Sequence, residues 1–291
     1  MTESHTTATP FTRTGDRARD RRRFTVTTDD DTPLVLTRYG RRDAAATVIY
    51  LHGPLADATS MAPLISEIHQ HFGGEIAQLV YDQRGHRHGV PFHPGLPGMA
   101  QLVADLDTVI AHASGRVILV AESFAAILLQ EWLFRHRRGV LRLDAVVAIC
   151  PAPALPGDRR SVRSGLADLV RQPGNCLERE LGIAFGILDC DNDLPILESI
   201  GALMDALRAG VSDVAVVEDM LRATPTWIVA GKQDRLVGHR LVAELADTVW
   251  AEWVLVDDAG HDLIATHTRI AADAVVAALE AAHDQTLFRG A

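Results

Sequence analysis

Six short apolar runs recur along the chain, separated by segments of helical periodicity, and no other feature limits the fold as much. The runs are Thr47–Leu51, Ile76–Tyr81, Arg116–Ala121, Ala145–Cys150, Thr226–Ala230 and Glu252–Val256. The helical segments are Ala58–His71, Met99–Ala113, Ser123–Arg138, His239–Thr248 and Leu263–His283. Continuously apolar strands that alternate with helices form parallel sheets covered on both faces. The sequence therefore predicts a doubly wound α/β fold with a mostly parallel sheet.

The beginning of the chain departs from this alternation. Phe24–Thr28 and Leu34–Tyr39 flank an Asp-rich turn that contains Pro33, a pattern typical of an antiparallel hairpin. Residues 1–23 are rich in Thr and Arg, and we predict that they form a disordered, solvated extension. A basic arm that contacts an acidic surface is the alternative interpretation of this segment.

One interval, residues 151–223, interrupts the strand–helix alternation. It contains Gly and Pro residues and helix-like pieces such as Ile196–Arg208 and Val214–Leu221, but no clear strand. An insertion after a strand lies at the edge where open α/β sheets bind their ligands. We therefore predict a helical cap that divides the core into residues 24–150 and 224–291.

Charge and cysteine content exclude several classes of partner. The chain has 28 Lys and Arg against 38 Asp and Glu, a formal net charge of −10. This charge repels phosphate backbones and anionic lipids, which argues against nucleic acid or membrane partners. No run approaches the roughly 18 apolar residues that a membrane span needs. The three cysteines form no paired motif, which is typical of a reducing compartment, and we expect a cytoplasmic protein.

Ser123 lies where an apolar strand runs directly into an apolar helix. Such a tight turn needs small neighbours two positions away, and Ala121 and Ala125 satisfy this requirement. The turn projects the serine hydroxyl above the sheet edge and points the helix N-terminus toward it. The alternative is that Ser123 merely caps the helix, because serine is a favoured N-cap residue.

Two further polar residues follow later strands. Asp234 comes shortly after the Thr226–Ala230 strand, and His261 follows the Glu252–Val256 strand. The carboxyl ends of parallel strands meet at one edge of a sheet, so the order Ser, Asp, His allows these three side chains to converge. Serine needs an adjacent base to act as a nucleophile, and a carboxylate can orient that base.

The sequence resembles the α/β-hydrolase family from Phe24 to the C-terminal helix. The motifs that carry the resemblance are Leu51-His52-Gly53, Tyr81-Asp82-Gln83-Arg84-Gly85-His86, Ala121-Glu122-Ser123-Phe124-Ala125, the Gly231–Asp234 turn and Ala259-Gly260-His261. The resemblance implies an α/β-hydrolase fold with an inserted cap. It also implies that Ser123 is the nucleophile, His261 the general base and acid, and Asp234 the group that orients His261.

The resemblance further implies an oxyanion hole formed by the Phe124 amide and by an amide after His52-Gly53. Proline has no N–H, so Pro54 does not donate at the usual position. Either the Leu55 amide substitutes, or the hole has a single backbone donor. Loss of one donor typically slows such reactions by about 10²–10³-fold.

We expect a serine hydrolase that cleaves a carboxylic ester, thioester or lactone of moderate size and apolar character, through an acyl-enzyme on Ser123. The alternatives are a lyase, cyclase or acyltransferase on the same scaffold, or a ligand-binding protein with slow turnover. The glycines form no dinucleotide or phosphate-loop pattern, so no cofactor is expected. His86, His88 and His93 lie close in sequence, but no carboxylate or cysteine pattern completes a metal site. The substrate and the oligomeric state stay open.

Overall fold

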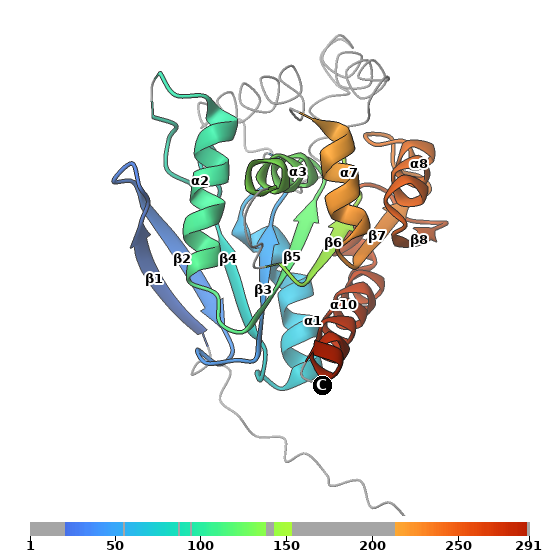
Figure 1. Cartoon of the computed structure of the whole chain (residues 1–291), viewed down its shortest axis with the longest axis horizontal. Coiled ribbons are helices and arrows are strands. Elements are labelled where there is room, and N and C mark those ends of the chain that lie inside the picture. The colour runs from blue at the N-terminus through green and yellow to red at the C-terminus, as the bar shows by residue number, and fades with distance from the viewer. Residues whose placement is uncertain are drawn as a thin grey trace, which may run out of the picture.

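The computed structural model describes residues 21–54, 56–86, 88–93, 95–137, 143–152 and 213–289. These residues form one eight-stranded sheet with the order β1-β2-β4-β3-β5-β6-β7-β8 (Figure 1). The strands are β1 (Arg21–Thr27), β2 (Pro33–Tyr39), β3 (Ala46–Leu51), β4 (Ala77–Tyr81), β5 (Arg116–Glu122), β6 (Ala145–Ile149), β7 (Thr226–Gly231) and β8 (Glu252–Val256). Strand β2 is antiparallel to β1 and to β4, and all other neighbours are parallel. The predicted fold class is confirmed.

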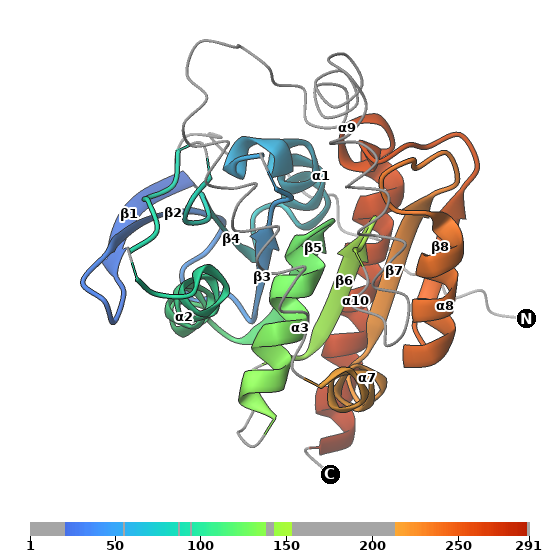
Figure 2. The same cartoon turned by 90° about the horizontal axis from the view of Figure 1, so that it is seen from above.

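Helices cover both faces of the sheet (Figure 2). One face packs against α2 (Gly98–Ala111), α3 (Ala125–His136), α7 (Val214–Arg222) and α8 (His239–Val249). The other packs against α1 (Ala62–Phe72), α9 (Leu263–Thr266) and α10 (Thr268–Arg289), and a short 3-10 helix, η1 (Ala58–Met61), precedes α1. In Figure 2 the sheet lies between these two layers.

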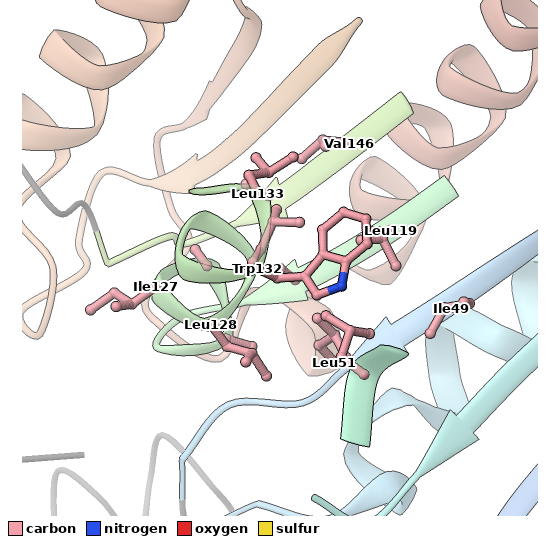
Figure 3. Close-up of a cluster of buried hydrophobic side chains, with 14 of the residues drawn as sticks. Ile49, Leu51, Leu119, Ile127, Leu128, Trp132, Leu133 and Val146 are labelled. Atoms are coloured by element: carbon pink, nitrogen blue, oxygen red, sulfur yellow. The ribbon is translucent and has the colours of Figure 1, made fainter. Parts of the chain in front are cut away.

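The central strands are buried throughout, which explains their unbroken apolar runs. Every residue of β3 is buried, and so is β5 from Val117 onward. Figure 3 shows Leu128 and Trp132 of α3 beside Leu51 and Leu119 of the sheet. Burial of each such side chain contributes about 1.5–3 kcal/mol. The core therefore holds β5 and α3 rigidly on either side of their junction.

Most observed bounds lie within two residues of the predicted ones. The helix predicted over Ala58–His71 begins as the 3-10 helix η1, and two further differences concern β1 and the C-terminal helix. Strand β1 begins at Arg21, three residues before the predicted start. The single helix expected over Leu263–His283 is split into α9 and α10 at His267, whose φ of −130° leaves the helical region. The His267 imidazole contacts Asp258 at 3.1 Å, which ties this break to the loop after β8.

Most of the predicted cap and of the N-terminal extension lies outside the described residues. Of the cap interval, the structure describes only residues 151–152 and 213–223. Helix α7 belongs to this interval, and it packs against α3 and α8 on the sheet face. Its N-cap residue is Asp213, whose carboxylate accepts the Val216 N–H at 3.3 Å. The cap itself stays a prediction.

A buried arginine ties the loop after β4 to the rest of the core. Arg84 is 1% exposed and donates two hydrogen bonds to Asp105 of α2, at 3.0 and 2.7 Å. It also contacts Asp30, in the turn between β1 and β2, at 2.8 Å. Hydrogen bonds from Arg84 lower the pKa of Asp30 well below its usual range. One guanidinium thus joins the hairpin, the β4 loop and α2.

Replacing Arg84 by Gln should strongly destabilise the protein. The substitution leaves the fully buried Asp105 carboxylate without its cation, and breaking a buried pair in this way costs about 3–5 kcal/mol. Urea unfolding followed by circular dichroism measures this loss. Arg41→Gln is the matched control, because Arg41 is exposed and pairs with exposed Asp43 and Glu75. Equal unfolding midpoints for the two variants would contradict the structural role of Arg84.

Candidate active site

Ser123 occupies the junction between β5 and α3 in a strained backbone conformation. Its φ is +54°, in the left-handed region that non-glycine residues rarely adopt. The Ser123 N–H donates to Ile149 O of β6 at 2.9 Å, which holds the turn against the neighbouring strand. Ala121 and Ala125 are both fully buried beside it. Small side chains at these two positions let the strand and the helix pass closely.

Ser123 does not cap helix α3. The residue at the N-cap position is Phe124, and no side-chain hydrogen bond caps the helix. The Ser123 hydroxyl instead contacts Nε2 of His261 at 2.8 Å. The interpretation of Ser123 as a simple helix cap is therefore wrong.

Asp234 is fixed by the turn that follows β7. Its Oδ1 accepts the N–H groups of Leu236 and Val237, at 2.8 and 2.9 Å. At the start of this turn a Cβ on Gly231 would lie 2.4 Å from Ala259 O, so only glycine lets the turn approach the loop after β8. One carboxylate oxygen is thus held by the backbone, and the other is left to face His261.

The three side chains that the sequence placed at strand ends come together at one edge of the sheet. His261 Nδ1 lies 2.7 Å from Asp234 Oδ2, and its Nε2 lies 2.8 Å from Ser123 Oγ. A carboxylate oxygen can only accept, so Nδ1 donates to Asp234 and Nε2 accepts the Ser123 hydroxyl. All three residues are less than 10% exposed. The arrangement links hydroxyl, imidazole and carboxylate in one chain of hydrogen bonds.

The surroundings of His261 favour its protonated form. Burial by itself lowers the pKa of His261. The hydrogen bond that its Nδ1 donates to Asp234 and the negative charges of Asp234, Glu122 and Asp262 outweigh burial and raise the pKa above its ordinary value of 6.5. An imidazole with a raised pKa is a stronger proton acceptor. The site is therefore suited to removing the proton from Ser123.

Glu122 connects the serine turn to the loop after β3. Its buried carboxylate accepts the Gly53 N–H at 3.1 Å. Burial raises the pKa of Glu122, while the nearby His261 and the Gly53 N–H oppose this rise. The residue beside Ser123 thus positions the loop that carries Pro54.

The described backbone offers one amide for an oxyanion. The Phe124 N–H has no acceptor among the described residues, and it lies at the start of α3 beside Ser123. The Gly53 N–H is engaged by Glu122, and Pro54 has none. Leu55 lies outside the described residues, so a donor role for its amide stays a prediction.

A pair of buried residues, which the sequence did not single out, locks this loop from the other side. His52 Nε2 accepts the Gln83 N–H at 3.0 Å, and the Gln83 side chain donates to His52 O at 2.6 Å. Burial lowers the pKa of His52 to about 4. His52 is therefore neutral at physiological pH and serves as an acceptor for the loop after β4. The family motifs contained both His52 and Gln83, but only the structure shows the hydrogen bonds between them.

The histidines close in sequence after β4 differ in their surroundings. His86 is buried, its ring meets that of His52 edge-on at 4.9 Å, and burial lowers its pKa to about 3. His88 is exposed and faces Asp57 at 3.6 Å. Within the described residues, these side chains are not among those close enough to share a metal ion.

Among the residues that the structure describes, one set of donor atoms is compact enough to consider as a metal centre. Cys150, Asp234 and His261 present donor atoms within 4.8 Å of one another. Burial, followed by the charge of Asp234, raises the pKa of the Cys150 thiol well above its usual value. Metals bind the thiolate rather than the thiol, and Asp234 and His261 already bond to each other. The three residues therefore fit a hydrogen-bonded Asp234–His261 pair beside a neutral Cys150 thiol better than they fit a metal centre.

A serine on a strand-to-helix turn, bonded to a histidine and an acid from later strand ends, defines the class of α/β enzymes with a nucleophile elbow. The family model described as the alpha/beta hydrolase family matches residues 48–278. The chain therefore belongs to the α/β-hydrolase family, as the motifs indicated.

Solved structures with the same fold support this assignment at low sequence identity. An esterase from Exiguobacterium antarcticum is 15% identical with a TM-score of 0.65, over 88% of this chain and 98% of that one. An esterase from Pyrococcus furiosus is 19% identical with a TM-score of 0.61, over 89% and 90%. A bromoperoxidase from Bacillus anthracis is 15% identical with a TM-score of 0.60, over 89% and 100%. No curated protein sequence matches the chain significantly.

None of the described helices has a segment both long and apolar enough to cross a bilayer.

Replacing Glu122 by Ala should destabilise the β3 loop, whereas Glu122→Gln should not. Alanine leaves the buried Gly53 N–H without an acceptor, which costs about 1–3 kcal/mol. The glutamine side-chain oxygen can still accept this hydrogen bond. Urea unfolding of both variants measures the difference. Equal stabilities would show that the bond to Gly53 does not hold the loop.

Proposed function

We propose that this protein is a serine hydrolase that cleaves a carboxylic ester, thioester or lactone through an acyl-enzyme on Ser123. The observation that carries the proposal is the hydrogen-bonded chain from Ser123 Oγ through His261 to Asp234, with contacts of 2.8 and 2.7 Å. Membership of the α/β-hydrolase family and the esterases among its structural neighbours support ester hydrolysis in general.

In the first half-reaction, Ser123 Oγ attacks the carbonyl carbon while His261 Nε2 accepts the hydroxyl proton. The carbonyl oxygen becomes an oxyanion as the new carbon–oxygen bond forms. When this intermediate collapses, the bond to the leaving group breaks and His261 returns the proton to that group. The product of this half-reaction is an ester on Ser123.

In the second half-reaction, water takes the place of the serine hydroxyl. His261 accepts a proton from the water, whose oxygen attacks the acyl carbon, and then returns the proton to Ser123 Oγ. Asp234 keeps the imidazole in the tautomer that accepts at Nε2 and stabilises its positive charge in both halves. The two backbone bonds to Asp234 Oδ1 hold that carboxylate in place.

The oxyanion is assigned to the N-terminal end of α3. The Phe124 N–H is available, and the helix dipole adds positive potential at this point. We assign a second donor to the Leu55 amide, because Pro54 has none and the Gly53 N–H is engaged. The cap predicted over residues 151–223 would supply the walls that select the substrate, a small molecule of apolar character.

One observation favours a second candidate function. With Gly53 engaged by Glu122 and Pro54 lacking an N–H, the described part of the β3 loop offers the oxyanion no amide at the usual place. A weakened hole slows ester hydrolysis more than chemistry that needs less oxyanion stabilisation. A lyase or cyclase that uses the same Ser123 and His261 is therefore the alternative that this observation favours. An acyltransferase on the same scaffold forms the same oxyanions as a hydrolase, so the observation does not separate those two. A binding protein with slow turnover is the limiting case.

A fluorophosphonate probe and a panel of p-nitrophenyl esters and acyl thioesters test the proposal. We expect the probe to label wild-type protein, and we expect Ser123→Ala to lose labelling together with about 10⁴-fold or more of the esterase rate. Cys150→Ser, which changes a neighbouring residue outside the triad, is the control. Full activity in Ser123→Ala contradicts the nucleophile assignment. Labelling without hydrolysis of any panel member favours the alternative chemistry.

The pH dependence of kcat/KM reports the protonation of His261. The reaction requires neutral His261, and its raised pKa means that activity falls as the pH drops through a midpoint above 6.5. His52 and His86 do not account for this limb, because their pKa values are about 4 and 3. A pH profile of ester hydrolysis at constant ionic strength measures the midpoint. An acidic limb centred below 6.5 would contradict the raised pKa of His261 and speak against its role as the base.

A further inference from the structure

A basic pocket lies at the end of the sheet opposite the triad. It has a volume of about 410 Å³. It is lined by Arg22 and Phe24 of β1, by Arg38 of β2 and Arg42 beyond it, and by residues 111–114 at and after the end of α2. Residue 114 is two positions before the start of β5, whereas Ser123 follows the end of that strand. Figure 1 shows β1, β2 and α2 side by side at this edge of the molecule. The pocket is therefore separate from the proposed active site.

Three arginines line this pocket. Arg22 and Arg38 are direct partners in the antiparallel register of β1 and β2, and Arg42 lines the same cavity. Like charges directly opposite each other across two strands destabilise a sheet. Among the described residues, no carboxylate lines the pocket and none forms an ion pair with these three arginines.

Two arginines outside this pocket provide a contrast. Arg41 pairs with Asp43 and Glu75, and Arg84 pairs with Asp30 and Asp105. The chain carries ten more acidic than basic groups, so carboxylates are in excess. Three arginines around one cavity, with no carboxylate among its described lining residues, are therefore not what the overall composition predicts.

Arg38 has unused hydrogen-bonding capacity at the centre of the cluster. Its Nη2 donates to His112 O at 2.8 Å, and its guanidinium lies 5.2 Å from the Phe24 ring centroid. Its Nε is buried and has no hydrogen-bond partner. Partial burial, followed by the positive charges of Arg42 and Arg22, lowers the pKa of Arg38. An anion in the pocket would supply the negative charge that the described lining residues lack.

We propose that this pocket binds a phosphate group, either inorganic phosphate or the phosphomonoester of a small molecule. Guanidinium groups form paired, charge-assisted hydrogen bonds with phosphate oxygens, and several arginines around one site suit a dianion. Phe24 and the neighbouring alanines provide an apolar wall for the organic part of such a ligand. The proposal does not depend on the catalytic role of Ser123.

Isothermal titration of the protein with inorganic phosphate at low ionic strength tests this site. The titrated parent protein carries the Ser123→Ala substitution. We expect one equivalent to bind, and Arg22→Gln and Arg42→Gln each to weaken binding about tenfold or more, because each removes charge-assisted hydrogen bonds. The Ser123→Ala background removes the nucleophile, and a Phe124 amide that bound phosphate would be unaffected by the two arginine substitutions.

Matched controls separate the pocket from general charge. Arg23→Gln removes the same charge from the same strand, but Arg23 lines a different surface cavity, beside Val35 and Thr37. Arg41→Gln removes the same charge near Arg42, from an arginine paired with Asp43 and Glu75. We expect both controls to bind phosphate as the parent does. Equal weakening in all four variants, or no binding by the parent, overturns the proposal.

A second arm identifies the source of the phosphate group. Sedimentation with phosphatidylcholine vesicles that contain phosphatidic acid presents the same phosphomonoester on a lipid surface. Binding of inorganic phosphate without vesicle binding supports a soluble ligand. Vesicle binding that Arg22→Gln and Arg42→Gln abolish, with Arg23→Gln unaffected, places the phosphomonoester on a lipid headgroup. Vesicle binding that all of these substitutions weaken equally reflects surface charge and contradicts a built site.

Discussion

The two hydrogen bonds of the His261 ring, 2.7 Å to Asp234 and 2.8 Å to Ser123, are the constraint on which the proposed chemistry depends. Both bonds require three loops, which follow β5, β7 and β8, to end within a few ångströms of one another. The parallel sheet provides this, because its strand ends share one edge. The strained φ of Ser123 is maintained because β5 and α3 are buried on either side of the turn. Burial of the core thus holds a conformation that an isolated turn would not keep.

The same burial has electrostatic consequences around the site. Desolvation lowers the pKa of His52 and raises the pKa values of Glu122 and Cys150. His261 differs because Asp234 and other negative groups oppose the effect of burial and raise its pKa. One imidazole is therefore basic enough to accept a proton, while a second serves only as a structural acceptor. Both His52 and His261 are buried, so the negative groups around His261 account for the difference between their pKa values.

Position within the fold also separates the two polar regions of the molecule. The triad lies at the carboxyl ends of the parallel strands, and the arginine pocket lies near the opposite ends, beside the antiparallel β1–β2 hairpin. The hairpin adds an edge to the sheet, and its register places Arg22 opposite Arg38. One end of the sheet thus carries the hydrogen-bonded triad. The opposite end carries three arginines that form no ion pair with any described carboxylate.

The sequence by itself determined the alternation of strands and helices, and with it the sheet, its covered faces and the strand ends that carry Ser123, Asp234 and His261. These follow from local periodicity and from the order of the motifs. Only the tertiary structure decided that Ser123 bonds to His261 rather than capping α3, and that Glu122 holds Gly53. It also decided that Arg22, Arg38 and Arg42 share one pocket. Hydrogen bonds and charge clusters between distant segments depend on register and loop path, which sequence spacing does not encode.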